Sequence, residues 1–102
     1  MWTISQKRLR DFWEIHPDAE TPLRQWYKVV SKASWSSLPD VRRVYPHADP
    51  VTLDNGTTLT VFNIGGNKYR LIARIEYVRH KVYVKQVLTH AEYSQAKWKS
   101  QL

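Results

Sequence analysis

The sequence predicts an α+β fold, and two patterns carry this prediction. In the first third of the chain, apolar residues recur at the spacing of amphipathic helices. In the second half, three runs rich in β-branched and aromatic residues are separated by short clusters of turn residues, as in a meander of antiparallel strands. At 102 residues the chain fits one compact unit, so we expect residues 1–102 to form a single domain.

The chain begins with a short β-prone stretch, "MWTIS", and continues into two predicted helices. In "QKRLRDFWEIHPDAE" the spacing i, i+3, i+4, i+7 of one buried stripe is shared by Leu9, Phe12, Trp13 and His16. Pro17 ends this helix. In the second helix, "ETPLRQWYKVVSKA", Thr21 suits the N-cap and Pro22 the first helical position. We therefore expect two antiparallel helices joined by a tight turn.

A loop and three strands are predicted to follow the helices. The stretch "SWSSLPDVRRVYPHADPV" is rich in proline and cap-type residues, so we expect a loop with a short helical turn from Asp40 to Tyr45. A turn at Asn55-Gly56 then precedes the strands. These are "LTVFNI", "YRLIARIEYV" and "KVYVKQVLT", separated by "GGNK" and "RHK". A short final helix completes the predicted order.

With a turn at Arg79-His80, the last two strands alternate between an apolar face and a basic face. The apolar face, which the helices would cover, receives Tyr77, Val82, Ile75, Val84, Ala73, Gln86, Leu71 and Leu88. The opposite face receives Arg70 and Tyr83, and it places Arg74 directly opposite Lys85. Two like charges in cross-strand contact destabilise a sheet, and an external anion would relieve that cost. A slip of one residue would bury both arginines, which their desolvation disfavours.

Composition and missing motifs narrow the classes of function. A formal charge of +7 and a pI near 9.9 indicate an acidic partner, with nucleic acid as the leading candidate. The absence of cysteine excludes disulfides, thiolate zinc sites and cysteine nucleophiles. The first residues contain no apolar run of the length of a signal peptide or a membrane span, so we expect a cytoplasmic protein without a membrane partner. Nucleotide-binding and hydrolase motifs are missing and the histidines lie far apart, so we expect no metal and no cofactor.

The stretch "VLTHAEY" joins the last strand to the final helix and combines a structural signal with a chemical one. Thr89 and Glu92 match the capping box S/T-x-x-E, which is a structural signal. His90 and Tyr93 lie on one side of the first helical turn. The positive end of the helix dipole favours the neutral imidazole, so His90 could accept a proton. The structural alternative is that His90 is a surface residue and Tyr93 packs on the core.

Basic residues form the second candidate feature. Arg70, Arg74 and Lys85 converge on one predicted sheet face, and Lys68 lies at its rim. Guanidinium groups bind phosphate in bidentate fashion and stabilise the additional negative charge of a pentacoordinate phosphorane. For Arg42 and Arg43 two readings stay open, because they either grip phosphate or keep a loop soluble.

Three segments together resemble a known protein family. They are "FWEIHPDAETPLRQWYKVV", "VFNIGGNKYRLIARIEY" and "VYVKQVLTHAEY", and the likeness runs over nearly the whole chain. In these segments the chain is similar to the HigB-type toxins of bacterial type II toxin–antitoxin systems, within the RelE-like superfamily. The resemblance implies a RelE-like fold, in which an N-terminal strand and a two-helix hairpin pack on a small antiparallel sheet with a short C-terminal helix.

The resemblance also implies a function, which is metal-free cleavage of mRNA, typically on the translating ribosome. A 2′-hydroxyl attacks the adjacent phosphate, with Arg70 stabilising the phosphorane, His90 or Tyr93 managing the proton, and Lys68 helping to hold the phosphate. The expected RNA contacts are Arg74, Lys85, Arg42, Arg43 and Lys97. The implied partners are mRNA, the ribosome and a HigA-type antitoxin with a helix-turn-helix domain, through which alone the toxin would reach operator DNA.

Two other classes of function are compatible with the residues themselves. A non-catalytic RNA- or DNA-binding module would use the charge of +7 for affinity alone, with steep salt dependence and no cleaved product. An interaction protein would use its basic face to bind an acidic protein. Cleavage assays on the same preparation distinguish these classes from a nuclease.

Overall fold

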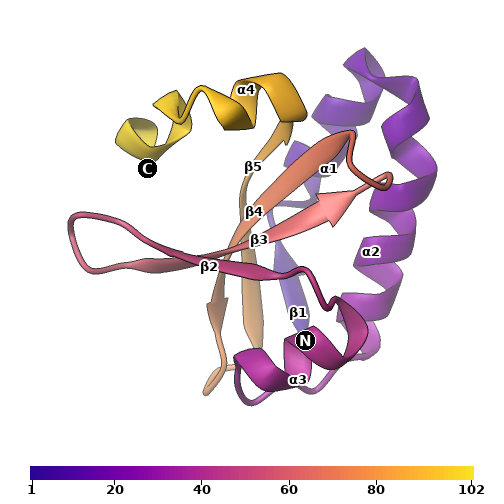
Figure 1. The fold of residues 1–102 in the computed structure, drawn as a ribbon. Coiled ribbons are helices and arrows are strands. Elements are labelled where there is room, and N and C mark those ends of the chain that lie inside the picture. The colour runs from indigo at the N-terminus through magenta and orange to yellow at the C-terminus, as the bar shows by residue number, and fades with distance from the viewer.

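The computed structural model describes residues 1–102 and contains one five-stranded sheet with strand order β1-β5-β4-β3-β2 (Figure 1). The elements are β1 (Trp2–Ile4), α1 (Gln6–Ile15), the 3₁₀ helix η1 (Pro17–Ala19), α2 (Glu20–Lys32), α3 (Leu38–Val44), β2 (Asp49–Thr52), β3 (Thr58–Ile64), β4 (Tyr69–Glu76), β5 (Lys81–Thr89), α4 (His90–Ser94) and the 3₁₀ helix η2 (Lys97–Gln101). β1 runs parallel to β5, and the other neighbours pair antiparallel. The predicted α+β architecture is confirmed. None of the helices is long and apolar enough to cross a membrane.

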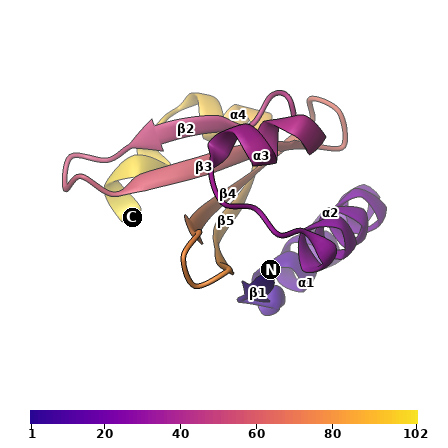
Figure 2. The same cartoon turned by 90° about the horizontal axis from the view of Figure 1, so that it is seen from below.

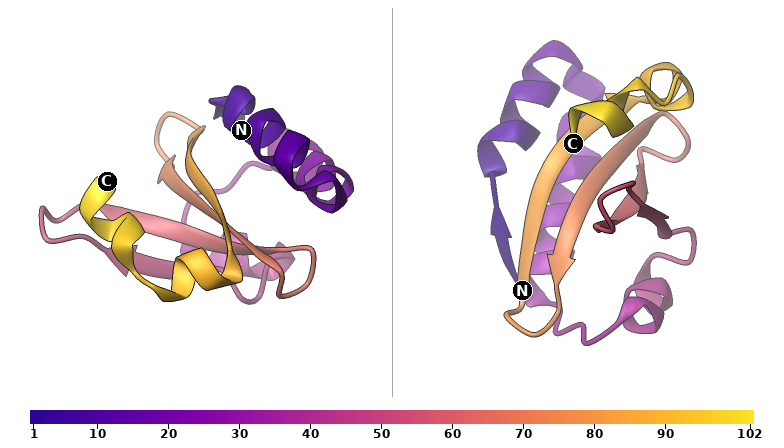
Figure 3. Two further views of the ribbon diagram at one scale, coloured as in Figure 1. Left: turned by 90° about the horizontal axis from the view of Figure 1, so that it is seen from above. Right: turned by 90° about the vertical axis from the view of Figure 1, so that its left-hand side faces the viewer.

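The sheet is covered on both faces by different parts of the chain (Figure 3). The α1–α2 hairpin packs on one face, where Leu23 and Trp26 of α2 are buried with Phe62 and Leu71 of the sheet. The α4–η2 segment crosses part of the other face, where Trp98 is buried in a smaller cluster with Leu59, Val61 and Ile72. Figure 2 shows the helical hairpin standing apart from the layer that contains β2, β3 and α4. The two faces therefore present separate surfaces.

The helical hairpin differs from its prediction at the junction. α1 ends at Ile15, before Pro17 as expected, and residues Pro17–Ala19 form a 3₁₀ turn. α2 then begins at Glu20 with Ala19 as its N-cap, so the prediction of Thr21 as N-cap was wrong. The predicted first position for Pro22 was wrong as well. Pro22 instead occupies the first turn of α2, where its missing N–H leaves no intrahelical hydrogen bond unmade.

The segment predicted as a loop contains more structure than expected. Its helical turn is α3, which begins at Leu38 and ends at Val44 instead of running from Asp40 to Tyr45. β2 was missed because Asp49 and Pro50 are poor strand formers. An edge strand tolerates proline, since one side of its backbone has no partner, and β2 pairs only with β3. The predicted three-stranded meander is therefore the centre of a larger sheet.

The β4–β5 hairpin departs from the predicted register in two ways. Glu76 pairs with Lys81, so the turn contains four residues, Tyr77 to His80, instead of two. A bulge follows, because Ala73 pairs with Val84 but Ile72 pairs with Gln86, which leaves Lys85 without a cross-strand partner. The prediction that Arg74 faces Lys85 was wrong: Arg74 pairs with Tyr83, and its guanidinium lies 4.7 Å above that ring.

The bulge also exchanges the two faces of β5 beyond Lys85. Leu88 pairs with Arg70, and it packs in the cluster of Trp98 instead of under the helices. Val87 pairs with Leu71 and packs in the core beneath the helices. The prediction had assigned these two residues to the opposite faces. Arg70 on the basic face of the sheet consequently has the apolar Leu88 as its neighbour on β5.

Candidate active site

A cavity of about 340 Å³ opens where three parts of the chain meet on the face that α4 borders. β3 and β4 form one side, α4 forms a second, and α3 with the loop after it forms the third. The polar side chains that line the cavity are Arg42, His47, Asp49, Asn63, Arg70 and Tyr93. Arg42, Arg70 and Tyr93 were predicted site residues, and the structure brings these three together.

Arg70 is held in the cavity by neutral oxygen atoms alone. The residue is only 8% exposed. Its Nη2 donates to Oδ1 of Asn67 at 2.6 Å, and its Nη1 donates to the carbonyl oxygens of Tyr69 at 3.0 Å and Asn67 at 3.3 Å. No carboxylate forms an ion pair with it. A largely buried cation without an ion-pair partner is costly, and an anion that entered the cavity would relieve this cost.

Tyr93 is positioned by the cap of α4. The predicted capping box is confirmed: the backbone N–H of Glu92 donates to Oγ1 of Thr89 at 3.2 Å, and the N–H of Thr89 donates to Oε1 of Glu92 at 2.9 Å. The ring of Tyr93 stacks on Trp98 with a centroid distance of 5.3 Å, and the indole Nε1 of Trp98 donates to the carbonyl of Tyr93 at 3.1 Å. The capped turn and the indole together fix the phenol beside Arg70.

The environment of Tyr93 keeps its hydroxyl protonated. Burial raises the pKa of Tyr93 above 10.0, the charge of Asp49 raises it further, and the charge of Arg70 lowers it. The guanidinium carbon of Arg70 lies 5.6 Å from the centre of the ring. At neutral pH the phenol of Tyr93 is therefore protonated and able to donate a hydrogen bond.

The loop after α3 brings residues that the sequence reasoning missed. Nε of Arg42 donates to the carbonyl of Ala48 at 3.1 Å and ties α3 to this loop, which carries His47. Asp49 follows at the start of β2. Asn63 is the β3 partner of Arg70 in the hairpin register. Only Asn63 had a usable signal, because a hairpin turn at "GGNK" aligns it with Arg70.

The remaining predicted site residues lie outside the cavity. His90 is exposed, and its backbone N–H donates to the carbonyl of Lys68 at 2.9 Å. Nζ of Lys68 lies 3.2 Å from Oδ2 of Asp18, on the side of η1. Arg74 pairs with Glu76 at 2.8 Å, and Arg43 pairs with Asp40 at 3.1 Å. Lys85 is the bulge residue of β5, and Lys97 is exposed at the start of η2. Their roles stay predictions.

Asp18 anchors the β3–β4 turn, which contains Asn67 and precedes Arg70 in β4. The hydroxyl of Tyr69 donates to Oδ1 of Asp18, and the ammonium of Lys68 binds its other oxygen. The hydrogen bond from Tyr69, and then that from Lys68, lowers the pKa of Asp18 below 3.8. Lys68 thus fastens the β3–β4 turn to the helical hairpin. No group of three or more His, Asp or Glu side chains is arranged to hold a metal ion.

The cavity combines groups suited to one kind of chemistry. An unpaired guanidinium is a ligand for a phosphate, a protonated phenol is a proton donor, and an imidazole is able to accept a proton. The two-helix hairpin and the five-stranded mixed sheet around this cavity are consistent with a RelE-like fold.

Comparison with known proteins identifies the family. Residues 19–96 match the family described as HigB_toxin, the RelE-like toxic component of a toxin–antitoxin system, and the chain belongs to this family. It is 33% identical over 96 residues to the mRNA interferase toxin HigB of Escherichia coli strain K12, covering 91% of this chain and 88% of the relative. The mRNA interferase HigB of Shigella flexneri gives the same values, and that of Escherichia coli O6:H1 is 29% identical over 93 residues. The resemblance predicted from the sequence is confirmed.

Proposed function

We propose that this chain is an endoribonuclease toxin that cleaves mRNA and inhibits translation until an antitoxin neutralises it. The names of its relatives support the enzyme class, because each is called an mRNA interferase. The single observation that carries the proposal is the largely buried, unpaired guanidinium of Arg70 beside the protonated phenol of Tyr93. This pair matches a scissile phosphate and its leaving group.

In the proposed reaction the 2′-oxygen of a ribose attacks the adjacent phosphorus. The new 2′-O–P bond forms as the P–O5′ bond breaks, which yields a 2′,3′-cyclic phosphate and a 5′-hydroxyl. Arg70 binds the non-bridging oxygens and stabilises the charge that develops on the phosphorane. Tyr93 gives its proton to the departing 5′-oxygen.

The proton of the attacking 2′-hydroxyl needs an acceptor. We assign this role to His47, because this residue lines the cavity and Tyr93 stays protonated. His90, the base expected from the sequence, lies outside the cavity, so its participation requires the bound RNA to extend over the start of α4. Arg42 enters as a second cation for the RNA backbone. Arg74, Lys85, Arg43 and Lys97 are proposed to contact more distant phosphates, and Lys68 supports the β3–β4 turn that precedes Arg70.

The cellular setting completes the proposal. The substrate is mRNA on a translating ribosome in the cytoplasm, and the neutralising partner is a HigA-type antitoxin with a helix-turn-helix domain. Operator DNA is reached only through that complex. The formal charge of +7 supports an encounter with the polyanionic ribosome.

The test is to map mRNA ends after adding the purified chain to a translating bacterial extract and, separately, to naked RNA. Arg70→Ala, His47→Ala and His90→Ala are compared with the parent chain, and circular dichroism verifies their folding. We expect cuts only in translated message, loss of cuts in Arg70→Ala, and a decrease of about 10²- to 10⁴-fold in His47→Ala. Folded protein that produces no cuts in either sample would favour a non-catalytic RNA-binding module.

A further inference from the structure

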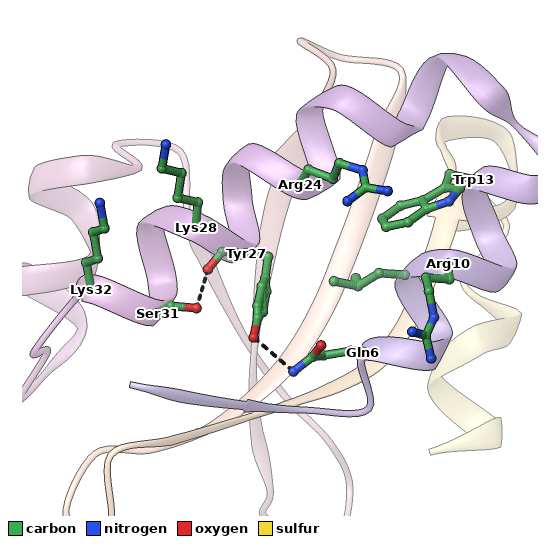
Figure 4. A pocket seen from close by; sticks show the side chains of 9 residues that line it. Gln6, Arg10, Trp13, Arg24, Tyr27, Lys28, Ser31 and Lys32 are labelled. Atoms are coloured by element: carbon green, nitrogen blue, oxygen red, sulfur yellow. Dashed lines mark hydrogen bonds between the residues drawn. The ribbon is translucent and has the colours of Figure 1, made fainter.

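A second cavity lies on the opposite side of the molecule, in the groove between α1 and α2 (Figure 4). Its volume is about 510 Å³, and only residues of the two helices line it. The helices run antiparallel here, since Gln6 near the start of α1 reaches Tyr27 in the second half of α2. None of the residues of the proposed active site takes part in this groove.

The rim of the groove is cationic. It carries Arg10, Arg24, Lys28 and Lys32, and no carboxylate lines it. Only Arg24 forms an ion pair, with Glu20 at 2.7 Å just outside the groove. Arg24, Lys28 and Lys32 repeat every fourth residue and make one stripe along α2. Like charges at this spacing destabilise a helix, and an anionic partner along the stripe would relieve the repulsion.

The floor of the groove is apolar. Leu9 is buried beneath it, and the rings of Trp13 and Tyr27 are half-buried in its walls. The guanidinium of Arg24 lies 4.7 Å from the centre of the Trp13 ring, and the hydroxyl of Tyr27 accepts a hydrogen bond from Nε2 of Gln6 at 2.9 Å. Single-stranded nucleic acid binds by stacking bases on free aromatic faces, but Arg24 already occupies a face of Trp13. An apolar floor beneath a cationic rim instead matches a peptide with apolar and acidic side chains on one face.

The length of the stripe indicates the form of that peptide. At about 1.5 Å per residue, the distance from Arg24 to Lys32 along α2 is about 12 Å. Carboxylates at positions i, i+4 and i+8 of a second helix span the same distance, and apolar residues between them would reach Leu9 and Trp13. An amphipathic acidic helix therefore fits the charges and the floor at once.

We propose that this groove is the docking surface for an acidic amphipathic helix of a protein partner, which in a toxin–antitoxin system is the antitoxin. The identity of the partner rests on the proposed function, whereas the chemistry of the groove does not. A helix bound here leaves the cavity of Arg70 and Tyr93 uncovered, because that cavity opens on the other face of the sheet.

The test measures binding of a fluorescein-labelled designed helix to the full chain by fluorescence anisotropy. The peptide carries Glu at i, i+4 and i+8 and Leu on the same face; a scrambled peptide and an oligouridine of equal charge are the comparison probes. Lys28→Glu with Lys32→Glu reverses two groove charges. Lys7→Glu with Arg79→Glu makes the same change in net charge at two exposed residues outside the groove.

We expect the dissociation constant of the designed helix to rise by at least about tenfold in the groove variant and to change less than about twofold in the control variant. Equal effects in both variants, equal binding of the scrambled peptide, or no saturable binding would overturn the proposal. Oligouridine that displaces the helix from the groove would assign the surface to nucleic acid instead. Concentration-dependent dimers lost in the groove variant would assign it to a second copy. mRNA cleavage is measured on the same preparations, so a parent chain that cleaves mRNA but does not bind the designed helix refutes only the docking surface.

Discussion

Replacing Asn67 by aspartate is the most direct test of whether cleavage depends on the unpaired positive charge of Arg70. Oδ1 of Asn67 accepts a hydrogen bond from Nη2 of Arg70 at 2.6 Å, so Asn67→Asp places a carboxylate against the guanidinium. A hydrogen bond between charged groups contributes about 1.5–3 kcal/mol. We take about 2–3 kcal/mol as the loss of attraction toward the scissile phosphate, which corresponds to a decrease of about 30- to 150-fold in kcat/KM. Stability should not decrease, because a largely buried cation acquires a partner.

Asn67→Ala separates the effect of pairing the charge of Arg70 from the effect of losing the hydrogen bond that holds its side chain. It removes the same hydrogen bond but leaves Arg70 unpaired, so we expect an unfolding free energy lower by about 1.5–3 kcal/mol. It should also decrease cleavage less than Asn67→Asp does. The assays are single-turnover cleavage and urea unfolding. Asn55→Asp is the matched control, since Asn55 is also a turn asparagine, its Oδ1 accepts from the backbone N–H of Thr57 at 2.9 Å, and it does not line the cavity. Full cleavage activity in folded Asn67→Asp would refute the argument that an unpaired guanidinium drives the reaction.

Three further predictions concern the supports of the site. Tyr93→Phe keeps the stacking on Trp98 but removes the proposed donor, so cleavage should fall by about 10²- to 10⁴-fold with an unchanged urea midpoint; a normal rate would exclude this donor. Thr89→Ala removes the N-cap of α4 and should lower the unfolding free energy by about 1 kcal/mol, and it should slow cleavage because Tyr93 loses its fixed position. Asp18→Asn should destabilise the fold at neutral pH. The folded-state pKa of Asp18 lies below 3.8, so its ionised form contributes stability above that pH, and the contribution is lost as pH falls through the folded-state pKa. If the unfolding free energies of the parent and Asp18→Asn still differed at pH values below the folded-state pKa, the ionised carboxylate of Asp18 would not be the source of the stability.

Local patterns predicted the elements best. The strand Lys81–Thr89 and the cap at Thr89 and Glu92 were predicted with the bounds that the structure has, because alternation and capping act over a few neighbouring residues. The bulge at Lys85 was not predictable in this way, since an unpaired residue is defined only by its partner strand. β2 was missed for a related reason. Its stability comes from pairing with β3, while the local preference of Asp49 and Pro50 opposes a strand.

The candidate site also contains residues that local sequence patterns predict and residues that only long-range contacts bring into place. Tyr93 was predicted from its spacing to His90, and Arg70 from the alternation of the last hairpin together with the family resemblance. Asp49 reaches the cavity because β2 pairs with β3, and the sequence reasoning did not place that strand. His47 lies in the loop just before it, which the hydrogen bond from Arg42 to Ala48 also holds. Lys68 was expected at the rim of the basic face, but Asp18, 50 residues earlier, binds its ammonium on the side of the helices. Lys68 is therefore paired by a carboxylate that is distant in sequence, whereas Arg74 and Arg43 pair with the nearby Glu76 and Asp40.

The presence or absence of a carboxylate partner separates the basic residues of the candidate sites into two groups. Arg74, Arg43 and Lys68 are each paired with a carboxylate, so their net contribution to binding an anion is reduced by the partner they would have to leave. Arg70 in the cavity and Lys28 and Lys32 in the groove have no such partner. Unpaired cations thus line both the cavity and the groove, on opposite faces of the sheet, and each of these two sites adds a second feature that selects its ligand. In the cavity this feature is a proton donor, which suits a reacting phosphodiester. In the groove this feature is an apolar floor, which suits a folded peptide. The two basic sites would therefore bind different anions, a phosphodiester in the cavity and an acidic helix in the groove.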